Sequence, residues 1–139
     1  MRVRLIAAGT RLPDWVNKGY AEYAKRLVGI RLELVEVRDS ERLLEKVAER
    51  DYAIALEVTG RAMTTAELAR WLEGRLAAGR DLAFVIGGAD GLAPALLKRA
   101  DFRWSLSPLT WPHGLARVMV AEQLYRAQSI LKGHPYHRG

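Results

Sequence analysis

Short apolar runs alternate with helical patterns along this chain, and this alternation constrains its fold more than any other feature. Five runs have the length and side-chain content of buried strands, and they cover residues 3–8, 32–37, 52–56, 82–86 and 102–105. The run Leu82–Ile86 is the most apolar, so we expect it at the centre of a sheet. The pattern predicts an α/β fold with a largely parallel sheet of five to six strands, flanked by helices.

Local signals predict where the first helices begin and end. Pro13 and Asp14 open a helix that is expected to run to about Val28. Asp39 and Ser40 can cap a second helix, whose apolar residues would share one face. That face would consist of Leu43, Leu44, Val47 and Ala48.

A third helix has the clearest boundaries. Thr64 and Glu67 have the spacing of a capping box, and Gly79 stands where a helix would end. Two more helices are expected over about residues 94–100 and 114–131.

Length, charge and composition narrow the class of protein. The 139 residues predict one domain over residues 1–139. Lys and Arg total 22 against 16 acidic residues, which favours an anionic partner such as nucleic acid, although a soluble protein from an arginine-rich proteome would have the same excess. The chain has no cysteine, no apolar run near the roughly 20 residues of a membrane helix, and no signal-peptide pattern, so we expect it in the cytoplasm.

Three unusual segments follow predicted strands, where ligands bind in open α/β sheets. They cover residues 56–60, 87–91 and 106–111. The glycines of the second segment do not have the order of a dinucleotide-binding motif, which argues against an oxidoreductase of that kind. These glycines could allow a flat ligand to approach the backbone, or they could simply form a tight turn.

The third segment, Leu106–Trp111, is apolar but carries two hydroxyl groups and is stiffened by prolines. A rigid loop with exposed amides suits an adenine edge and a thioether chain. The alternative is a buried connection whose hydroxyls bond only to the local backbone.

The chain ends in an unusual motif, His134 to Arg138. Arg138 can pair with a phosphate, Tyr136 can stack on a base, and His137 can accept a proton; the alternative is a frayed terminus. His113, His134 and His137 could suggest a metal, but the chain has no cysteine and no carboxylate triad near them, so we expect no metal site.

Together, the opening residues Leu5–Thr10, the glycine segment, the Leu106–Trp111 loop and the terminal motif resemble one family. It is the pseudouridine N3-methyltransferases of 23S ribosomal RNA, in the SPOUT superfamily, and the resemblance covers about residues 1–138. It implies a deep trefoil knot, in which the C-terminal segment threads a loop. It also implies that three knot loops bind S-adenosylmethionine, largely through backbone groups.

The resemblance assigns roles to individual residues. Leu56 falls in the first knot loop, and Gly87 with Gly88 in the second. The third loop would contribute Leu106, Ser107, Pro108, Leu109, Thr110 and Trp111. The catalytic residues would be Tyr136, His137 and Arg138, with His137 or solvent accepting the proton of the pseudouridine.

The last predicted helix brings Glu122, Tyr125 and Arg126 to one face. From spacing alone this could be an ordinary surface ion pair. The resemblance instead implies that the helix builds a homodimer, in which the tail of one subunit faces the knot of the other.

The chain departs from the family between Val37 and Leu43, where the segment is short and lacks a longer basic stretch. RNA contacts would then come from cationic residues elsewhere, namely Arg11, Lys18, Lys25, Arg26 and Arg61. Trp15, Asn17 and Lys18 also resemble the family, but packing and solvated surface explain them equally well.

The expected function is S-adenosylmethionine-dependent methylation of a pseudouridine in 23S ribosomal RNA, on the large subunit or the whole ribosome. Two alternatives remain open. One is a non-catalytic RNA-binding or ribosome-assembly module of the same fold, and the other is a methyltransferase that acts on another RNA, such as transfer RNA.

Overall fold

The computed structural model describes residues 1–112 and 114–138, and its centre is one parallel sheet with the strand order β2-β1-β4-β3-β5. The strands are β1 (Arg2–Ala8), β2 (Arg31–Val37), β3 (Tyr52–Ala62), β4 (Leu82–Ile86) and β5 (Phe102–Ser105). All five residues of β4 are buried, and this strand occupies the centre of the sheet. The predicted α/β class and the central place of the most apolar strand are confirmed.

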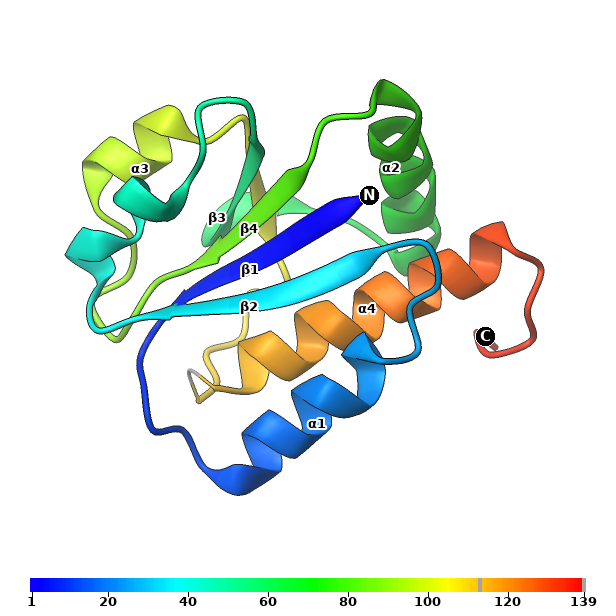
Figure 1. Cartoon of the computed structure of the whole chain (residues 1–139), viewed down its shortest axis with the longest axis horizontal. Coiled ribbons are helices and arrows are strands. Elements are labelled where there is room, and N and C mark those ends of the chain that lie inside the picture. Colours follow the sequence, from blue (N-terminus) through cyan, green and yellow to red (C-terminus); the bar gives the residue numbers. More distant parts are fainter. Residues whose placement is uncertain (113, 139) are drawn as a thin grey trace.

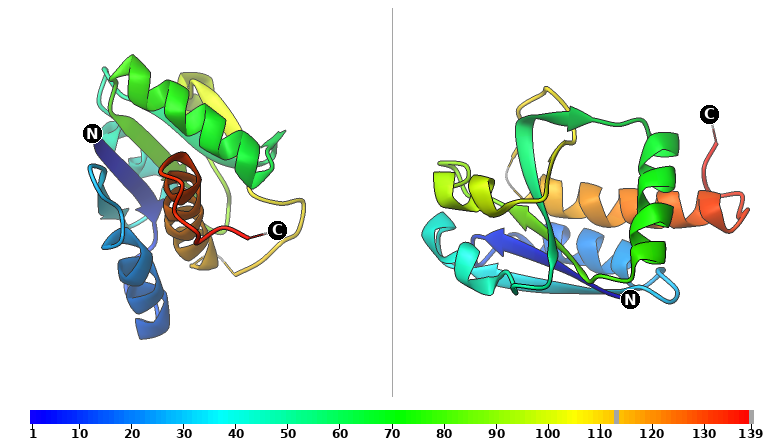
Figure 2. Two further views of the ribbon diagram at one scale, coloured as in Figure 1. Left: turned by 90° about the vertical axis from the view of Figure 1, so that its right-hand side faces the viewer. Right: turned by 90° about the horizontal axis from the view of Figure 1, so that it is seen from above.

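Helices cover both faces of the sheet (Figure 1). One face carries α1 (Asp14–Ala24), α2 (Thr65–Ala78) and α4 (Leu115–Leu131), with α4 between the other two (Figures 1 and 2). The opposite face carries α3 (Pro94–Arg99) and two short 3-10 turns, η1 (Ser40–Arg42) and η2 (Leu44–Lys46). No helix among the described residues is long and apolar enough to cross a membrane.

Alternating side chains of the strands build two separate cores. In β1, Leu5 points into the core under α1, α2 and α4, and Ile6 points into the core under α3. In the larger core, the ring of Phe84 lies edge-on to those of Trp71 and Trp104, with centroids 6.1 and 5.9 Å apart.

The predicted boundaries of α2 are confirmed at both ends. The Glu67 amide donates to the Thr64 hydroxyl at 3.1 Å, and the Glu67 carboxylate accepts from the Thr64 amide at 3.0 Å. Gly79 ends the helix with a left-handed φ of 80°.

The first helix is shorter than expected and ends at Ala24. The side chain of Gln128 on α4 accepts from the Val28 amide at 3.0 Å and donates to the Val28 carbonyl at 2.6 Å. Because Gln128 satisfies both backbone groups of Val28, that residue does not need a helical partner.

The prediction of a helix after Asp39 is wrong, because the two 3-10 turns η1 and η2 form there instead. Leu43 is buried, but Leu44 is 37% exposed and Val47 is extended, so the expected apolar face does not form. The Ser40 hydroxyl does not cap a helix; it accepts a hydrogen bond from the amide of Gly88 at 2.9 Å.

The third strand is longer than its apolar run, because it pairs with β5 on both sides of a bulge. The pairing changes register between Leu56 and Arg61. Within the bulge, Gly60 lies so close to β5 that a Cβ atom there would come within 2.7 Å of the Arg103 carbonyl. Residues 57–60 therefore form an irregular part of β3 beside β5.

Candidate functional site

Three loops meet at one edge of the sheet because β4, β3 and β5 are parallel neighbours. Leu56 is paired with Trp104 of β5, and the preceding residue of β3, Ala55, is paired with Val85 of β4. The carboxyl ends of the three strands thus lie at nearly the same level. The segments that follow them, which lie far apart in sequence, share one opening.

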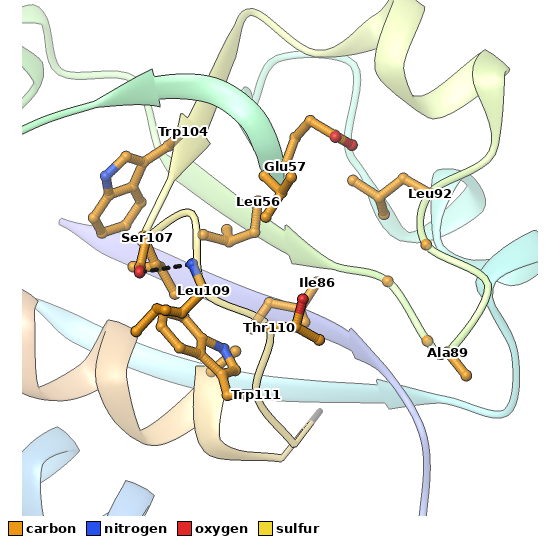
Figure 3. A pocket seen from close by; sticks show the side chains of 16 residues that line it. Leu56, Glu57, Ile86, Ala89, Leu92, Trp104, Ser107, Leu109, Thr110 and Trp111 are labelled. Carbon is orange, nitrogen blue, oxygen red and sulfur yellow. Dashed lines mark hydrogen bonds between the residues drawn. The ribbon is translucent and has the colours of Figure 1, made fainter.

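Between these loops lies a cavity of about 520 Å³ (Figure 3). Eight of the nine predicted cofactor-binding residues line it: Leu56, Gly87, Gly88, Leu106, Ser107, Leu109, Thr110 and Trp111. Pro108 does not line it, and its side chain is exposed. The remaining lining residues are Glu57, Val58, Ile86, Ala89, Gly91, Leu92, Trp104 and Ala116.

The glycine segment after β4 forms a tight turn. The Gly91 amide donates to the Gly88 carbonyl at 2.9 Å, and Gly91 has a left-handed φ of 75°. A Cβ atom on Gly87 would lie within 2.6 Å of the Gly91 carbonyl carbon. The tight-turn explanation therefore accounts for Gly87, and the turn exposes its backbone to the cavity.

The Leu106–Trp111 loop is held by one of its own hydroxyl groups. The Ser107 hydroxyl accepts from the Leu109 amide at 3.0 Å, as the local-bonding alternative expects. The Leu109 side chain is 70% exposed, whereas Trp104 at the base of the loop is 3% exposed. The loop thus projects over the cavity and leaves apolar surface available to a ligand (Figure 3).

Sequence reasoning missed half of the lining. Ile86, Trp104 and Ala116 are buried and have the pattern of ordinary core residues, so no local signal separates them from the core. Glu57 could have been found, because it directly follows Leu56 in a segment already placed at the site.

The terminal motif folds back on α4. The Tyr136 hydroxyl donates to the Glu122 carboxylate at 2.7 Å, and the Tyr136 ring lies edge-on to Tyr125 with centroids 4.6 Å apart. Arg126 pairs with Glu122 at 2.7 Å, lies over the Tyr136 ring, and contacts Nδ1 of His137 at 3.3 Å. The spacing argument for Glu122, Tyr125 and Arg126 is confirmed, and these residues hold the tail.

This contact also keeps the Tyr136 hydroxyl protonated. Burial, and then the hydrogen bond to Glu122, raise the pKa of Tyr136 above its ordinary value. The hydrogen bond to Glu122 also raises the pKa of Arg126. Tyr136 therefore remains a neutral donor at physiological pH and is not suited to act as a base.

Within one chain, the tail and the Leu106–Trp111 loop, which lines the cavity, lie near opposite ends of α4 (Figures 1 and 2). Ala116 in the first turn of α4 lines the cavity, and the helix, 17 residues long, runs away from it. At 1.5 Å per residue, this separates its ends by about 25 Å. Tyr136, His137 and Arg138 do not line the cavity, and Arg138 is exposed, with Nε 3.4 Å from the Pro135 carbonyl.

A buried arginine that the sequence analysis did not single out supports the same edge of the sheet. Arg117 is fully buried in α4, where it pairs with Glu36 of β2 and donates to the Gly9 carbonyl at 2.8 Å. The Arg117 Nε and the hydroxyl of Tyr20 have no hydrogen-bond partner among the described residues. An arginine in a helix usually indicates a surface position, which explains why it was missed.

The cationic residues expected to contact RNA are all exposed. Lys25 and Arg26 both pair with Glu22, at 3.1 and 2.7 Å, so their charge is partly neutralised. Arg11 and Lys18 lie near Trp15 in sequence, and the Trp15 side chain is 57% exposed. Trp15 is therefore a surface residue.

Among residues 1–112 and 114–138, no group of three or more His, Cys, Asp and Glu side chains could hold a metal ion. His113, which the sequence analysis considered as a possible ligand, lies outside the described residues.

The chain matches a protein-family model described as "Predicted SPOUT methyltransferase" over residues 1–137. It is 53% identical to a protein of Alkalilimnicola ehrlichii and 47% identical to one of Thioalkalivibrio sulfidiphilus, covering 99% of each chain. Both are named ribosomal RNA large subunit methyltransferase H. The first alignment spans 154 positions, more than the 139 residues here, so that relative has residues that this chain lacks.

Two solved structures share the fold. A "probable methylase family protein" from Haemophilus influenzae superposes with a TM-score of 0.58 at 16% identity, over 99% of this chain and 70% of that one. The SpoU methyltransferase AviRb from Streptomyces viridochromogenes, solved with its cofactor AdoMet, gives a TM-score of 0.54 at 10% identity, over 92% and 57%.

Proposed function

Because the chain belongs to the SPOUT methyltransferase family, we propose that it transfers the methyl group of S-adenosylmethionine to N3 of a pseudouridine in 23S ribosomal RNA. One observation carries the proposal: the three segments predicted to bind the methyl donor line a single cavity. The substrate follows from the relatives that share about half of the residues over nearly the whole chain.

The cavity has the properties that this donor requires. Its volume of about 520 Å³ lies in the range of small-molecule sites, and its lining is largely apolar, with glycine backbone along one side. Leu56, Gly87 and the Leu106–Trp111 loop would hold the nucleoside through backbone groups and apolar contact. Pro108 has no amide hydrogen and does not line the cavity, so it would stiffen the loop without contacting the donor.

Bound there, S-adenosylmethionine supplies an electrophilic methyl group and leaves as a neutral thioether. The protein then has two tasks: to align the attacking N3 atom with the methyl–sulfur bond, and to let N3 lose its proton. His137 is the proposed acceptor of that proton, and solvent is the alternative. Arg138 would bind a phosphate of the RNA and favour negative charge on the base.

The distance between tail and cavity indicates how the site is completed. Since α4 separates them within one chain, we propose a homodimer in which the tail of one subunit reaches the cavity of the other. Tyr136, His137 and Arg138 would act in the partner's site, positioned by Glu122 and Arg126 of their own chain.

The substrate would be the large subunit or the whole ribosome, which places the protein in the cytoplasm. A small protein has little surface for reading an RNA sequence, so a structured particle is the more suitable partner. Arg11 and Lys18 are exposed cations that could contact its phosphates, as could Arg61, which lies 3.9 Å from the Glu67 carboxylate.

The direct test uses ribosomes and isolated subunits that lack the modification. Incubation with the protein and S-adenosylmethionine, followed by digestion and mass spectrometry, should place one added methyl group on a pseudouridine of 23S RNA. Methylation of transfer RNA alone would contradict the proposed substrate. Absence of heat on titration with S-adenosylhomocysteine would favour the non-catalytic binding module.

A further inference from the structure

The charge of the cavity is opposite to that of the protein. The chain has a net charge of +6, yet among the described residues Glu57 is the only charged one that lines the cavity. The net positive charge of the protein disfavours a cationic ligand, whereas a carboxylate at the opening of the cavity attracts one. The apolar and hydroxyl side chains and the glycines that form the rest of the lining carry no charge, so they do not account for this difference in sign.

The bulge in β3 places this carboxylate at the cavity. Leu56 is the last residue of β3 that pairs with β5 before the bulge, and Glu57 follows it directly. The pairing with β5 resumes at Arg61. The side chain extends toward Leu92 at the edge of the cavity, on a different side from Ser107 and Trp111 (Figure 3).

The Glu57 carboxylate is held in place by its own segment. One of its oxygens accepts from the Thr59 hydroxyl at 3.1 Å and from the Thr59 amide at 3.4 Å. Among the described residues, no Lys, Arg or His side chain forms an ion pair with Glu57 within 4.0 Å. Its charge is therefore oriented but not neutralised by an arginine or lysine.

We propose that Glu57 makes the cavity prefer the cationic methyl donor over the neutral product of the reaction. This inference rests on the proposed function. S-adenosylmethionine and S-adenosylhomocysteine share the adenosine, the α-ammonium group and the α-carboxylate, and differ in one methyl group and one positive charge on sulfur. A fixed negative charge beside the cavity acts on that difference, and apolar walls do not.

The expected size of the effect follows from exposure. Glu57 is half-buried, so its field is stronger than in bulk water but weaker than in a dry interior. At this intermediate screening, one charge at contact or near-contact distance should change a binding ratio by about tenfold. Such a preference would weaken the binding of the product after the reaction. The next molecule of the methyl donor could then replace it.

Calorimetric titration of the intact protein tests this inference. S-adenosylmethionine, S-adenosylhomocysteine and sinefungin, which carries an amine in place of the sulfonium, are titrated into the wild type, Glu57→Gln and Glu73→Gln. Glu73 is an exposed acid on α2 outside the cavity lining, so it controls for the loss of one negative charge from the protein.

In Glu57→Gln, the affinity for the two cationic ligands should fall about tenfold, and the affinity for S-adenosylhomocysteine should change less than about twofold. In the wild type, the preference for the cationic ligands over S-adenosylhomocysteine should shrink as salt is added. In Glu57→Gln, the ratio of these affinities should not depend on salt in this way. Glu73→Gln should bind all three ligands as the wild type does.

Equal weakening of all three ligands by Glu57→Gln would overturn the inference, because the carboxylate would then contact the shared α-ammonium group or only shape the loop. Unchanged affinities with slower methyl transfer would also overturn it, in favour of a role in proton removal. Both results leave the proposed function intact. If the wild type binds none of the ligands, the proposed function itself fails.

Discussion

Gly87 lies where a side chain has no room. A Cβ atom there would meet the Gly91 carbonyl, so even alanine must open the turn that exposes backbone to the cavity. We expect Gly87→Ala to weaken binding of S-adenosylhomocysteine by about tenfold or more, measured by calorimetry.

Gly74 on α2 provides the matched control, since a Cβ atom at that position meets nothing within 4 Å. Gly74→Ala should leave ligand binding unchanged and raise the free energy of unfolding by about 0.5–1 kcal/mol. Wild-type affinity in Gly87→Ala would remove the glycine turn from the binding site.

Tyr20 should make stability depend on alkaline pH. Burial raises the pKa of Tyr20 to about 12, with Arg117 acting in the opposite direction. Between the ordinary pKa of 10 and the raised pKa, Tyr20 loses its proton in the unfolded state and keeps it in the folded state. The contribution of this shift to the free energy of unfolding is therefore fully present below about pH 10 and is lost as the pH rises above it.

Tyr20→Phe removes this dependence and leaves no hydroxyl without a partner. From pH 10 upward, the free energy of unfolding of the wild type should fall relative to Tyr20→Phe by up to about 1.4 kcal/mol per pH unit. Urea titrations at several pH values measure this difference, and parallel curves for the two proteins would show that Tyr20 is not buried as described.

At the scale of elements, α4 depends on Arg117 for its contact with β2 and with the loop after β1. Arg117→Met would leave Glu36 and the Gly9 carbonyl without their donor. Because Glu36 is partly exposed, we expect a loss of about 2–4 kcal/mol in the free energy of unfolding, at the low end of values for buried pairs.

Arg70→Met on the exposed face of α2 removes the same charge and should change stability by less than about 0.5 kcal/mol. Chemical denaturation of both variants gives the comparison. Similar stability of the two would mean that Arg117 contributes no more than a surface residue.

Local signals predicted those elements whose ends depend on neighbours in sequence. The capping box of α2 and its glycine stop involve residues three positions apart and one backbone angle, so the sequence contains all the information. The helix expected after Asp39 failed for the opposite reason. The hydroxyl of Ser40 accepts a hydrogen bond from the amide of Gly88, 48 positions later in the sequence, and no local pattern reveals this contact.

The site was predictable to the extent that it follows from strand ends. Parallel strands bring the segments after Leu56, Ile86 and Ser105 to one edge, and motif resemblance identified them. The order of the strands was not predictable from periodicity, since β3 lies between β4 and β5 through non-local pairing. The threading of the chain into a knot stays a prediction.

At the scale of the whole molecule, the separation of tail and cavity predicts that neither subunit works alone. A variant lacking residues 136–139 should bind S-adenosylhomocysteine as the wild type does but lose methylation. Arg138→Ala should show the same division with a smaller loss of activity, because Arg138 would contact only the RNA.

Coexpression tests whether the tail acts on the partner. Mixed dimers of the tail-truncated chain and Gly87→Val contain one intact cavity that faces one intact tail. With random pairing, activity should recover to about a quarter of the wild-type value. If the two inactive variants form mixed dimers and methylation does not recover, the site is not shared between subunits in this way.

The most direct test of the account is a crystal structure of the protein with S-adenosylhomocysteine bound. We predict a ligand between the turn at Gly87 and the Leu106–Trp111 loop, in contact with Leu56 and with its sulfur atom on the side of Glu57. A ligand bound on another surface, with these three segments empty, would contradict the central claim.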